Sequence, residues 1–211
     1  MTAGSTRAPD ETLALLDWRR QVAELYGEVR AACCVHAAWK RWRDVRRVLL
    51  REHPQSPIPS ARRRDCTGPH VYDHDPAWRA LASVNPAEPL RRELPGTGEE
   101  TVAANRFALA EFELAGTERT LELYWLEGYG GGLFVPFADA TSGQETYGAG
   151  RYLLDTVKGA DLGQRDGRLV LDFNFAYQPS CSYDPRWACP LAPAANRLTL
   201  PVRAGERLWA S

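Results

Sequence analysis

The spacing of the apolar residues changes once along this chain, about a quarter of the way from the N-terminus. Between Thr12 and Ala32, and again between His36 and Glu52, apolar side chains recur every three or four positions. That spacing places them on one face of a helix and predicts two amphipathic helices. Pro54 ends the second helix, because proline disfavours helical backbone at the residue before it, and a stiff proline-rich connector follows.

Beyond about Val71 the apolar residues occur in short runs separated by turn-forming residues. Alternation of apolar and polar positions is typical of half-buried strands, so we expect strands in this part of the chain. The segment from Ala115 to Glu118 predicts a hairpin turn, a change of phase near Ala110 predicts a bulge, and Pro136 indicates a sheet edge or a bulge. The expected strands cover residues 107–114, 121–125, 133–137, 151–157, 169–175 and 198–202.

Together these patterns predict a mainly β (α+β) protein: an antiparallel β-barrel or sandwich packed against two N-terminal α-helices. Residues 1–60 would form a helical arm packed on a β domain at residues 61–211, effectively as one domain. A chain of 211 residues is long enough to bury a core without disulfide staples.

Charge and composition argue against several classes of partner. The formal net charge is -1, which gives no reason to expect binding to nucleic acid or to an anionic membrane. No window approaches the roughly 18 unbroken apolar residues of a membrane span, and residues 1–10 lack the apolar core of a signal peptide, so we expect a cytoplasmic protein. Lys40 and Lys158 are the only lysines among 26 basic residues, a bias typical of a GC-rich genome.

The five cysteines are expected to be free thiols in a reducing cytoplasm. For Cys181 and Cys189 a disulfide or a role as metal ligands stays open. Their spacing differs from the C-x2-4-C pairs of common structural zinc sites, so we expect no metal. A Cys181 nucleophile with a histidine base is a further alternative, although no family signature supports one. A thiol packed beside Trp187 is the simpler interpretation.

Three ordered blocks carry a resemblance to a known family. They are the tryptophan-rich helix leading into residues 53–57, the segment 131–153, and the segment 171–181 with its continuation through Cys189–Pro190 to residues 196–198. With these blocks the chain resembles the bacterial and archaeal proteins grouped as domain of unknown function 1684, over roughly residues 12–208. Cys33–Cys34 departs from the family pattern. The resemblance implies a shared fold but no known reaction.

Polar side chains alternate with seven glycines between Gly128 and Gly150. Glycine permits close backbone approach, so such a segment could wrap a ligand. The spacing matches neither a phosphate-binding loop nor a dinucleotide fingerprint. A pair of turns, with Asp139 and Thr141 bonding to local backbone, accounts for the same pattern, and both interpretations stay open.

A second polar group follows the strand expected near residue 171. Asp172 and Asn174 share one face of that strand, because alternate residues point the same way. With Arg151 and Glu145 nearby, Asp172 could have a raised pKa and act as a general acid or base. A buried ion pair that only satisfies backbone groups is the alternative that we favour, because structural ion pairs also perturb pKa values.

The leading functional hypothesis is a cytoplasmic small-molecule-binding β-barrel protein, more specifically a cofactor-independent enzyme that hydrolyses or cyclises a small metabolite by acid–base catalysis. The expected catalytic residues are Asp172, Glu145 and His53. The stiff connector would hold His53 at the barrel mouth. For His53 we favour the simpler role of complementing the dipole of the preceding helix. The expected ligand-binding residues are Arg151, Asn174, Tyr147, Tyr177, Asp139, Thr141 and Ser142.

Three alternatives belong to other classes. A non-catalytic ligand-binding module would keep the pocket but not depend on any one carboxylate. A structural or interaction protein would use the strand edge near Pro136 and the helical arm to form a homo-oligomer. A flavin- or metal-binding barrel is less favoured, and we expect no cofactor.

Overall fold

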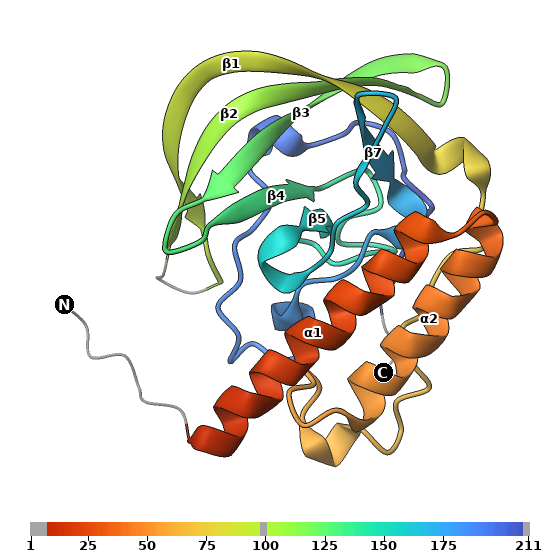
Figure 1. Ribbon diagram of the computed structural model, residues 1–211, viewed down its shortest axis with the longest axis vertical. Coiled ribbons are helices and arrows are strands. Elements are labelled where there is room, and N and C mark those ends of the chain that lie inside the picture. The colour runs from red at the N-terminus through yellow and green to blue at the C-terminus, as the bar shows by residue number, and fades with distance from the viewer. Residues whose placement is uncertain (1–7, 98–100, 209–211) are drawn as a thin grey trace.

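Two long helices lie side by side at one end of the molecule, and a curved sheet arches over the other end (Figure 1). The computed structural model describes residues 8–97 and 101–208. Helix α1 spans Pro9–Ala31 and helix α2 spans Val35–Glu52. A proline in the first turn of α1, followed by Asp10 and Glu11, suits the positive end of the helix dipole. Both predicted helices are therefore confirmed. None of the helices in the described residues is long and apolar enough to cross a membrane.

The strands form one antiparallel sheet in the order β5-β4-β3-β2-β1-β7-β6. Short 3-10 turns η1 to η6 cover Ser60–Arg62, Pro76–Trp78, Thr156–Lys158, Phe173–Phe175, Ser180–Ser182 and Ala194–Asn196. The strands are β1 Arg79–Pro95, β2 Thr101–Leu114, β3 Thr117–Leu126, β4 Gly132–Phe137, β5 Arg151–Asp155, β6 Gln164–Arg165 and β7 Arg168–Asp172.

The mainly β fold with two N-terminal helices is confirmed, but the sheet is not closed into a barrel. In the part of the chain that the structure describes, β5 and β6 are the two ends of the strand order and do not pair with each other. Strand β6 has only two residues, which is too short to close a barrel. The outer edge of β5 is occupied instead by an isolated bridge between Tyr152 and Tyr177.

The hairpin between β2 and β3 is confirmed, but its turn is shorter than the predicted residues 115–118, because β3 already begins at Thr117. Ala115 and Gly116 both have positive φ, 52° and 73°, as a tight two-residue turn between twisted strands requires. Pro136 lies at a shift of register between β4 and β5, which confirms a bulge there. The bulge expected near Ala110 is instead at the Arg106–Ala108 step of β2. The sequence pattern places Phe107 among the buried residues of this strand, but Phe107 lies on the outer face and is 39% exposed.

The sequence pattern does not predict β1 or β6, and three expected strands differ from the structure, the first of them at 151–157, which ends at Asp155 and continues as a 3-10 turn. The long strand β1 escaped the sequence pattern because its prolines interrupt the alternation, and its register with β2 shifts between Pro86 and Leu90. The expected strand at 169–175 ends at Asp172, whose carboxylate accepts a bond from the Asn174 N–H and starts a 3-10 turn. Residues 198–202 form no strand; the Leu198 N–H bonds to the Ala138 carbonyl as part of an irregular C-terminal segment.

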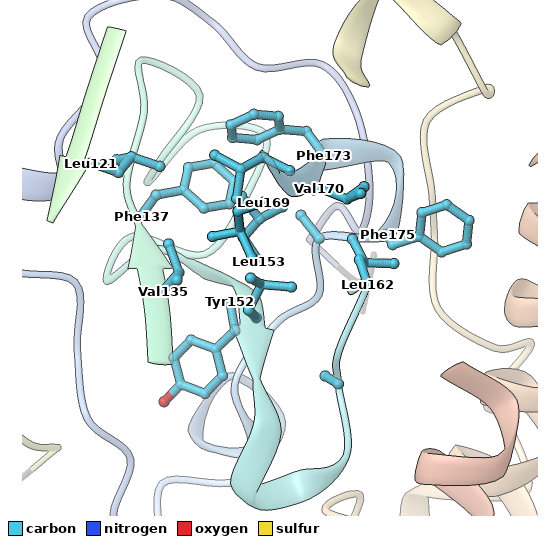
Figure 2. Close-up of a cluster of buried hydrophobic side chains, with 14 of the residues drawn as sticks. Leu121, Val135, Phe137, Tyr152, Leu153, Leu162, Leu169, Val170, Phe173 and Phe175 are labelled. Atoms are coloured by element: carbon cyan, nitrogen blue, oxygen red, sulfur yellow. The ribbon is translucent and has the colours of Figure 1, made fainter. Parts of the chain in front are cut away.

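The core fills the space between the concave face of the sheet and the helices. Figure 2 shows its centre, where side chains from β4, β5, β7 and the 3-10 turn after β7 converge. Trp42 joins the two helices to this core: its Nε1 donates to the Tyr26 hydroxyl at 3.2 Å, and its ring packs edge-on against Phe175 at 5.5 Å. The helices therefore belong to the same buried cluster as the sheet.

Candidate functional site

The polar side chains of the glycine-rich segment bond mainly to one another. The buried Asp139 carboxylate accepts bonds from the Thr141 N–H at 2.7 Å and the Thr141 hydroxyl at 2.6 Å. The Ser142 hydroxyl accepts from the Asp139 N–H at 3.1 Å. This is the local side-chain-to-backbone pattern of a turn, the second of the two interpretations that the sequence left open.

Arg151 connects that turn to the C-terminal segment. One of its terminal nitrogens lies 2.8 Å from Asp139 Oδ2 and also donates to the Val202 carbonyl at 2.8 Å. The other donates to the carbonyls of Ala204 and Glu206. Complete burial lowers the pKa of Arg151, and the Asp139 carboxylate opposes that shift. Arg151 is thus a buried link between β5 and the end of the chain.

Glu145 and His53, two of the three expected proton carriers, are held in fixed pairs. Arg203 and the Tyr72 hydroxyl donate to the Glu145 carboxylate, each at 2.8 Å, and the bond from Arg203 lowers the pKa of Glu145 to about 2. His53 Nε2 lies 3.1 Å from Asp17, while its Nδ1 accepts from the Gln55 N–H at 3.0 Å. Each side chain therefore bonds to a segment that lies beside it in space but is distant in the sequence.

The remaining predicted ligand contacts lie in two different places. Tyr177 is buried, with its hydroxyl 3.4 Å from Asp155 and the Arg46 guanidinium 4.8 Å above its ring. Tyr147 bonds to the Cys181 thiol, and its burial together with that bond raises the pKa of Tyr147 to about 12. The ten predicted site residues therefore do not gather around one cavity.

Asp172 lines a pocket of about 330 Å³ at the junction of α1 and α2. The pocket lies between that junction, residues 162–165 and the end of β7. Asp172 Oδ1 accepts from the Asn174 N–H at 3.1 Å and from the Asn174 side-chain amide at 2.8 Å, and Oδ2 lies 3.4 Å from Arg79 Nε. Burial raises the pKa of Asp172 above that of an ordinary carboxyl group.

Asn174 supports this carboxylate from the other side. Its amide exchanges two bonds with the backbone of Asp75, at 2.9 and 3.0 Å, and so holds the loop before β1 against the end of β7. His74 lies in that loop, close enough to Asp172 for the carboxylate to raise its pKa, although partial burial has the larger, lowering effect. Of the predicted residues, the structure thus brings Asp172 and Asn174 together.

Sequence reasoning missed three residues that line the same pocket. Arg79 is the register partner of Asp172 in the β1–β7 pair, Arg30 comes from the last turn of α1, and Arg165 from β6. Arg79 is the residue that a correct assignment of β1 would have identified, because neighbours across an antiparallel pair share a face. Arg30 and Arg165 carry no signal in the sequence that separates them from other surface arginines.

No group of three or more possible metal ligands occurs in the ranges 8–97 and 101–208. Cys181 and Cys189, the pair that the sequence left open, lie close together as free thiols beside a separate small pocket.

Comparisons with known proteins identify the family. A family model described as "Protein of unknown function (DUF1684)" matches residues 65–207. The chain belongs to this family. This confirms the resemblance seen in the sequence. A solved structure that is also similar to this DUF1684 protein is the uncharacterised protein from locus rrnAC0354 of Haloarcula marismortui. It is 37% identical, with a TM-score of 0.59, over 81% of this chain and 92% of that one. None of the curated proteins compared with the chain matches it.

Only part of the lining of the Asp172 pocket lies within the residues that match the DUF1684 family model. All seven strands lie within the matched residues, whereas α1 and α2 precede them. Arg79, Asp172 and Arg165 therefore come from the family segment, and Arg30 comes from the helix outside it. In this DUF1684 protein the helical arm completes the pocket.

Proposed function

We propose that this protein binds a small anionic metabolite in the Asp172 pocket. The observation that carries the proposal is the convergence of Arg30, Arg79 and Arg165, from three separate segments, on one cavity of about 330 Å³. Asp172 is the single acidic residue among those described as lining it. Outside the lining, the Asp161 carboxylate lies 3.4 Å from Arg30 and the Asp166 carboxylate lies 3.9 Å from Arg165, so an anionic ligand would compete with these two exposed pairs for the guanidinium groups. Guanidinium groups present a planar fork of donors that matches a carboxylate or a phosphate.

The three arginines differ in how firmly they are held. Arg30 donates to the Asp161 carbonyl at 2.6 Å, which fixes its direction, and 39% of its side chain stays exposed. Arg79 is more buried, with 26% of its side chain exposed, and is balanced by Asp172. Arg165 is the most exposed of the three, at 66%. We expect Arg30 and Arg79 to orient the ligand and Arg165 to add attraction at the rim.

Binding is tested with simple anions of matched shape. Succinate and inorganic phosphate should raise the melting temperature of the protein at constant ionic strength, whereas the neutral diamide of succinate should not. Arg165→Gln should reduce the shift. Arg168→Gln removes the same charge from the cross-strand partner of Arg165, which lines a different pocket, and should leave the shift unchanged. Equal effects of succinate and its diamide would overturn the proposal.

A second candidate function is acid–base catalysis by Asp172 on the bound metabolite, a hydrolysis or cyclisation without a cofactor. The observation that favours it is that Asp172 and Arg79 both line the pocket, with Arg79 Nε 3.4 Å from Asp172 Oδ2, while Oδ1 takes both bonds from Asn174. Burial raises the pKa of Asp172 and makes its carboxylate a better proton acceptor.

Asp172→Asn separates binding from catalysis. The substitution keeps the shape of the side chain and removes its basicity. Wild-type and variant protein are incubated with a defined mixture of phosphorylated and carboxylated metabolites, and consumption is followed by mass spectrometry. If Asp172 is the acid–base group, the wild-type protein consumes one component of the mixture and the Asp172→Asn variant consumes none. The variant should still show the anion-dependent shift of melting temperature, because binding is kept. Consumption at equal rates by both would remove Asp172 as the acid–base group.

A further inference from the structure

Cys181 and Cys189 meet at the base of a short loop, and neither of them lines the proposed anion pocket. The backbone N–H of Cys181 donates to Cys189 Sγ at 3.3 Å, and the two thiols bond to each other. The turn that closes this loop is held by Asp184, which accepts bonds from the N–H groups of Arg186 and Trp187. The loop therefore holds two thiols in contact without joining them.

The surroundings of the two sulfur atoms are unequal. The thiol of Cys181 donates to Cys189, and this bond lowers the pKa of Cys189; Lys158 and the N–H groups of Ser180 and Cys181 add to the effect. The same contact raises the pKa of Cys181. Cys189 lines the pocket described next and Cys181 does not, so Cys189 is the thiol that a ligand there would meet, and the lowered pKa of Cys189 favours its thiolate form. A thiolate is the nucleophilic form of cysteine.

Cys189 also lines a pocket of about 200 Å³ between α1 and the loop. Lys158 and Arg19 line it too, with Trp18 and Trp187 as apolar walls, and its described lining residues include no acid. The Lys158 ammonium group also lies 3.5 Å from the Asp155 carboxylate, and 38% of the Lys158 side chain is exposed. A small ligand with negative charge fits these walls.

We propose that Cys189 and Cys181 form a thiol–disulfide exchange site whose substrate is a small anionic disulfide. Cys189 is the attacking residue and Cys181 the resolving residue. The pocket admits the disulfide beside Cys189, and Lys158 and Arg19 select for its negative charge.

The reaction balances as two successive displacements. The Cys189 thiolate attacks one sulfur of the disulfide RSSR; a Cys189–SR bond forms, the S–S bond breaks, and RS⁻ leaves. RS⁻ takes the proton of the Cys181 thiol and becomes RSH. The Cys181 thiolate then attacks Cys189 Sγ, the protein disulfide forms, and a second RS⁻ leaves and is protonated from solvent. The two cysteines are oxidised by two electrons and RSSR is reduced to two thiols.

Tyr147 has a place in the second displacement. Its hydroxyl bonds to Cys181, a contact that lowers the pKa of that thiol against the larger effects of Cys189 and burial. Tyr147 is thus a positioning residue for the resolving thiolate. Tyr147→Phe should slow the closing of the protein disulfide and leave the first attack by Cys189 unchanged.

The site is tested in a Cys33→Ser/Cys34→Ser background, which removes the two exposed thiols. The reduced protein is incubated with dithiodipropionate, an anionic disulfide, and digested with trypsin. Cleavage after Arg168, Arg186 and Arg197 places the two cysteines in separate peptides, 169–186 and 187–197. The expected product is a disulfide that joins these two peptides. Absence of this linked pair, with both thiols still free, would overturn the proposal.

Single variants assign the two roles. Cys181→Ser should accumulate a mixed disulfide on Cys189, because the resolving thiol is missing. Cys189→Ser should leave Cys181 unmodified over the same time. The reverse pattern, with Cys181 modified in the Cys189→Ser protein at the wild-type rate, would overturn the assignment. Cys66, Cys181 and Cys189 are all buried, and only Cys189 of the three lines the pocket, so Cys66 stays in every variant as the reference for a buried thiol outside the site.

The charge selection has its own test. The rate at which the protein reacts is measured with dithiodipropionate and with cystamine, a cationic disulfide. Each rate is divided by the rate at which the same disulfide reacts with N-acetylcysteine, a model thiol. Wild type should prefer the anionic reagent, and Lys158→Met should lower that preference about tenfold. Lys40→Met removes the other lysine, which lies exposed on α2, and should leave the preference for the anionic reagent unchanged. Equal preference in wild type and Lys158→Met would show that Lys158 selects nothing.

Discussion

Arg46 Nε lies 2.6 Å from Glu206 Oε1, and both side chains are buried. The second carboxylate oxygen of Glu206 accepts from the Gln178 N–H at 2.7 Å and the Tyr183 hydroxyl at 3.3 Å. The Arg46 guanidinium also lies 5.3 Å above the Trp42 ring. One ion pair therefore joins α2, the loop after β7 and the C-terminal segment.

Removing one partner of this pair should be costly. Glu206→Gln leaves the Arg46 charge buried without compensation, and we expect a loss of about 3–5 kcal/mol in the free energy of unfolding. The matched control is Arg41→Met, which breaks an exposed pair with Glu28 and should cost less than about 1 kcal/mol. Urea unfolding followed by circular dichroism measures both. Equal, small losses would contradict the structural role of the buried pair.

Gly205 is expected to tolerate no side chain. Its φ is 74°, and a Cβ there would lie 2.4 Å from the Ala176 carbonyl oxygen and 2.7 Å from that of Phe173. Gly116 has nearly the same φ, 73°, but a Cβ there meets nothing within 4 Å. Gly116→Ala should therefore cost about 1 kcal/mol from backbone strain alone. Gly205→Ala should cost about 1–3 kcal/mol more, because backbone must move. Thermal unfolding of the two variants compares them directly.

The Glu145–Arg203 pair should make stability depend on acid pH. The pKa of Glu145 falls from 4.5 to about 2 in the folded protein, chiefly through its bond from Arg203. A carboxyl group with a lowered folded pKa stabilises the protein above its unfolded pKa and loses that contribution as the pH falls through the lowered value. Glu145→Gln should therefore flatten the decline of melting temperature between about pH 4.5 and 2.

Glu118→Gln is the control for that titration, since Glu118 is exposed beside the β2–β3 turn. Its curve should keep the wild-type slope in the same pH range. If the Glu145→Gln and wild-type curves ran parallel there, the pair with Arg203 would contribute nothing to acid stability.

The Asn196 side chain should contribute to stability, because it joins strands β3 and β4. Its side-chain oxygen accepts from the Glu122 N–H at 2.8 Å, and its side-chain nitrogen donates to the carbonyls of Glu122 at 3.0 Å and Pro136 at 2.8 Å. Asn196→Ala leaves three buried backbone groups without partners and should cost about 2–4 kcal/mol. Asn105→Ala, which removes an amide bonded to Glu127 near the surface, should cost less than half as much. Chemical unfolding tests the difference.

The sequence pattern was sufficient to predict the elements whose conformation depends on neighbouring residues in the chain. Helices α1 and α2 follow from three- and four-residue spacing, and the end of α2 at Glu52 follows from Pro54. The hairpin at residues 115–118 follows from a glycine-containing turn between alternating runs, and the structure narrows the turn to Ala115 and Gly116. Strand β1 and the outward face of Phe107 did not follow, because prolines and an exposed aromatic break the alternation that predicts strands.

The candidate sites depend on contacts between distant segments. Asp172 was visible in the sequence as a carboxylate at a strand end, but its partner Arg79 lies 93 positions earlier and becomes its neighbour only through the β1–β7 register. Arg151 and Glu145 were expected beside Asp172, and the structure gives them other partners, Asp139 and Arg203.

The sequence by itself determined the helices, the hairpin, the family and the residue types that carry chemistry. Only the tertiary structure decided that three arginines share the Asp172 pocket and that Lys158 joins the Cys181–Cys189 pair. The physical reason is that periodicity records which face of an element is buried, whereas the partner across the core is set by register and packing between segments far apart in the chain.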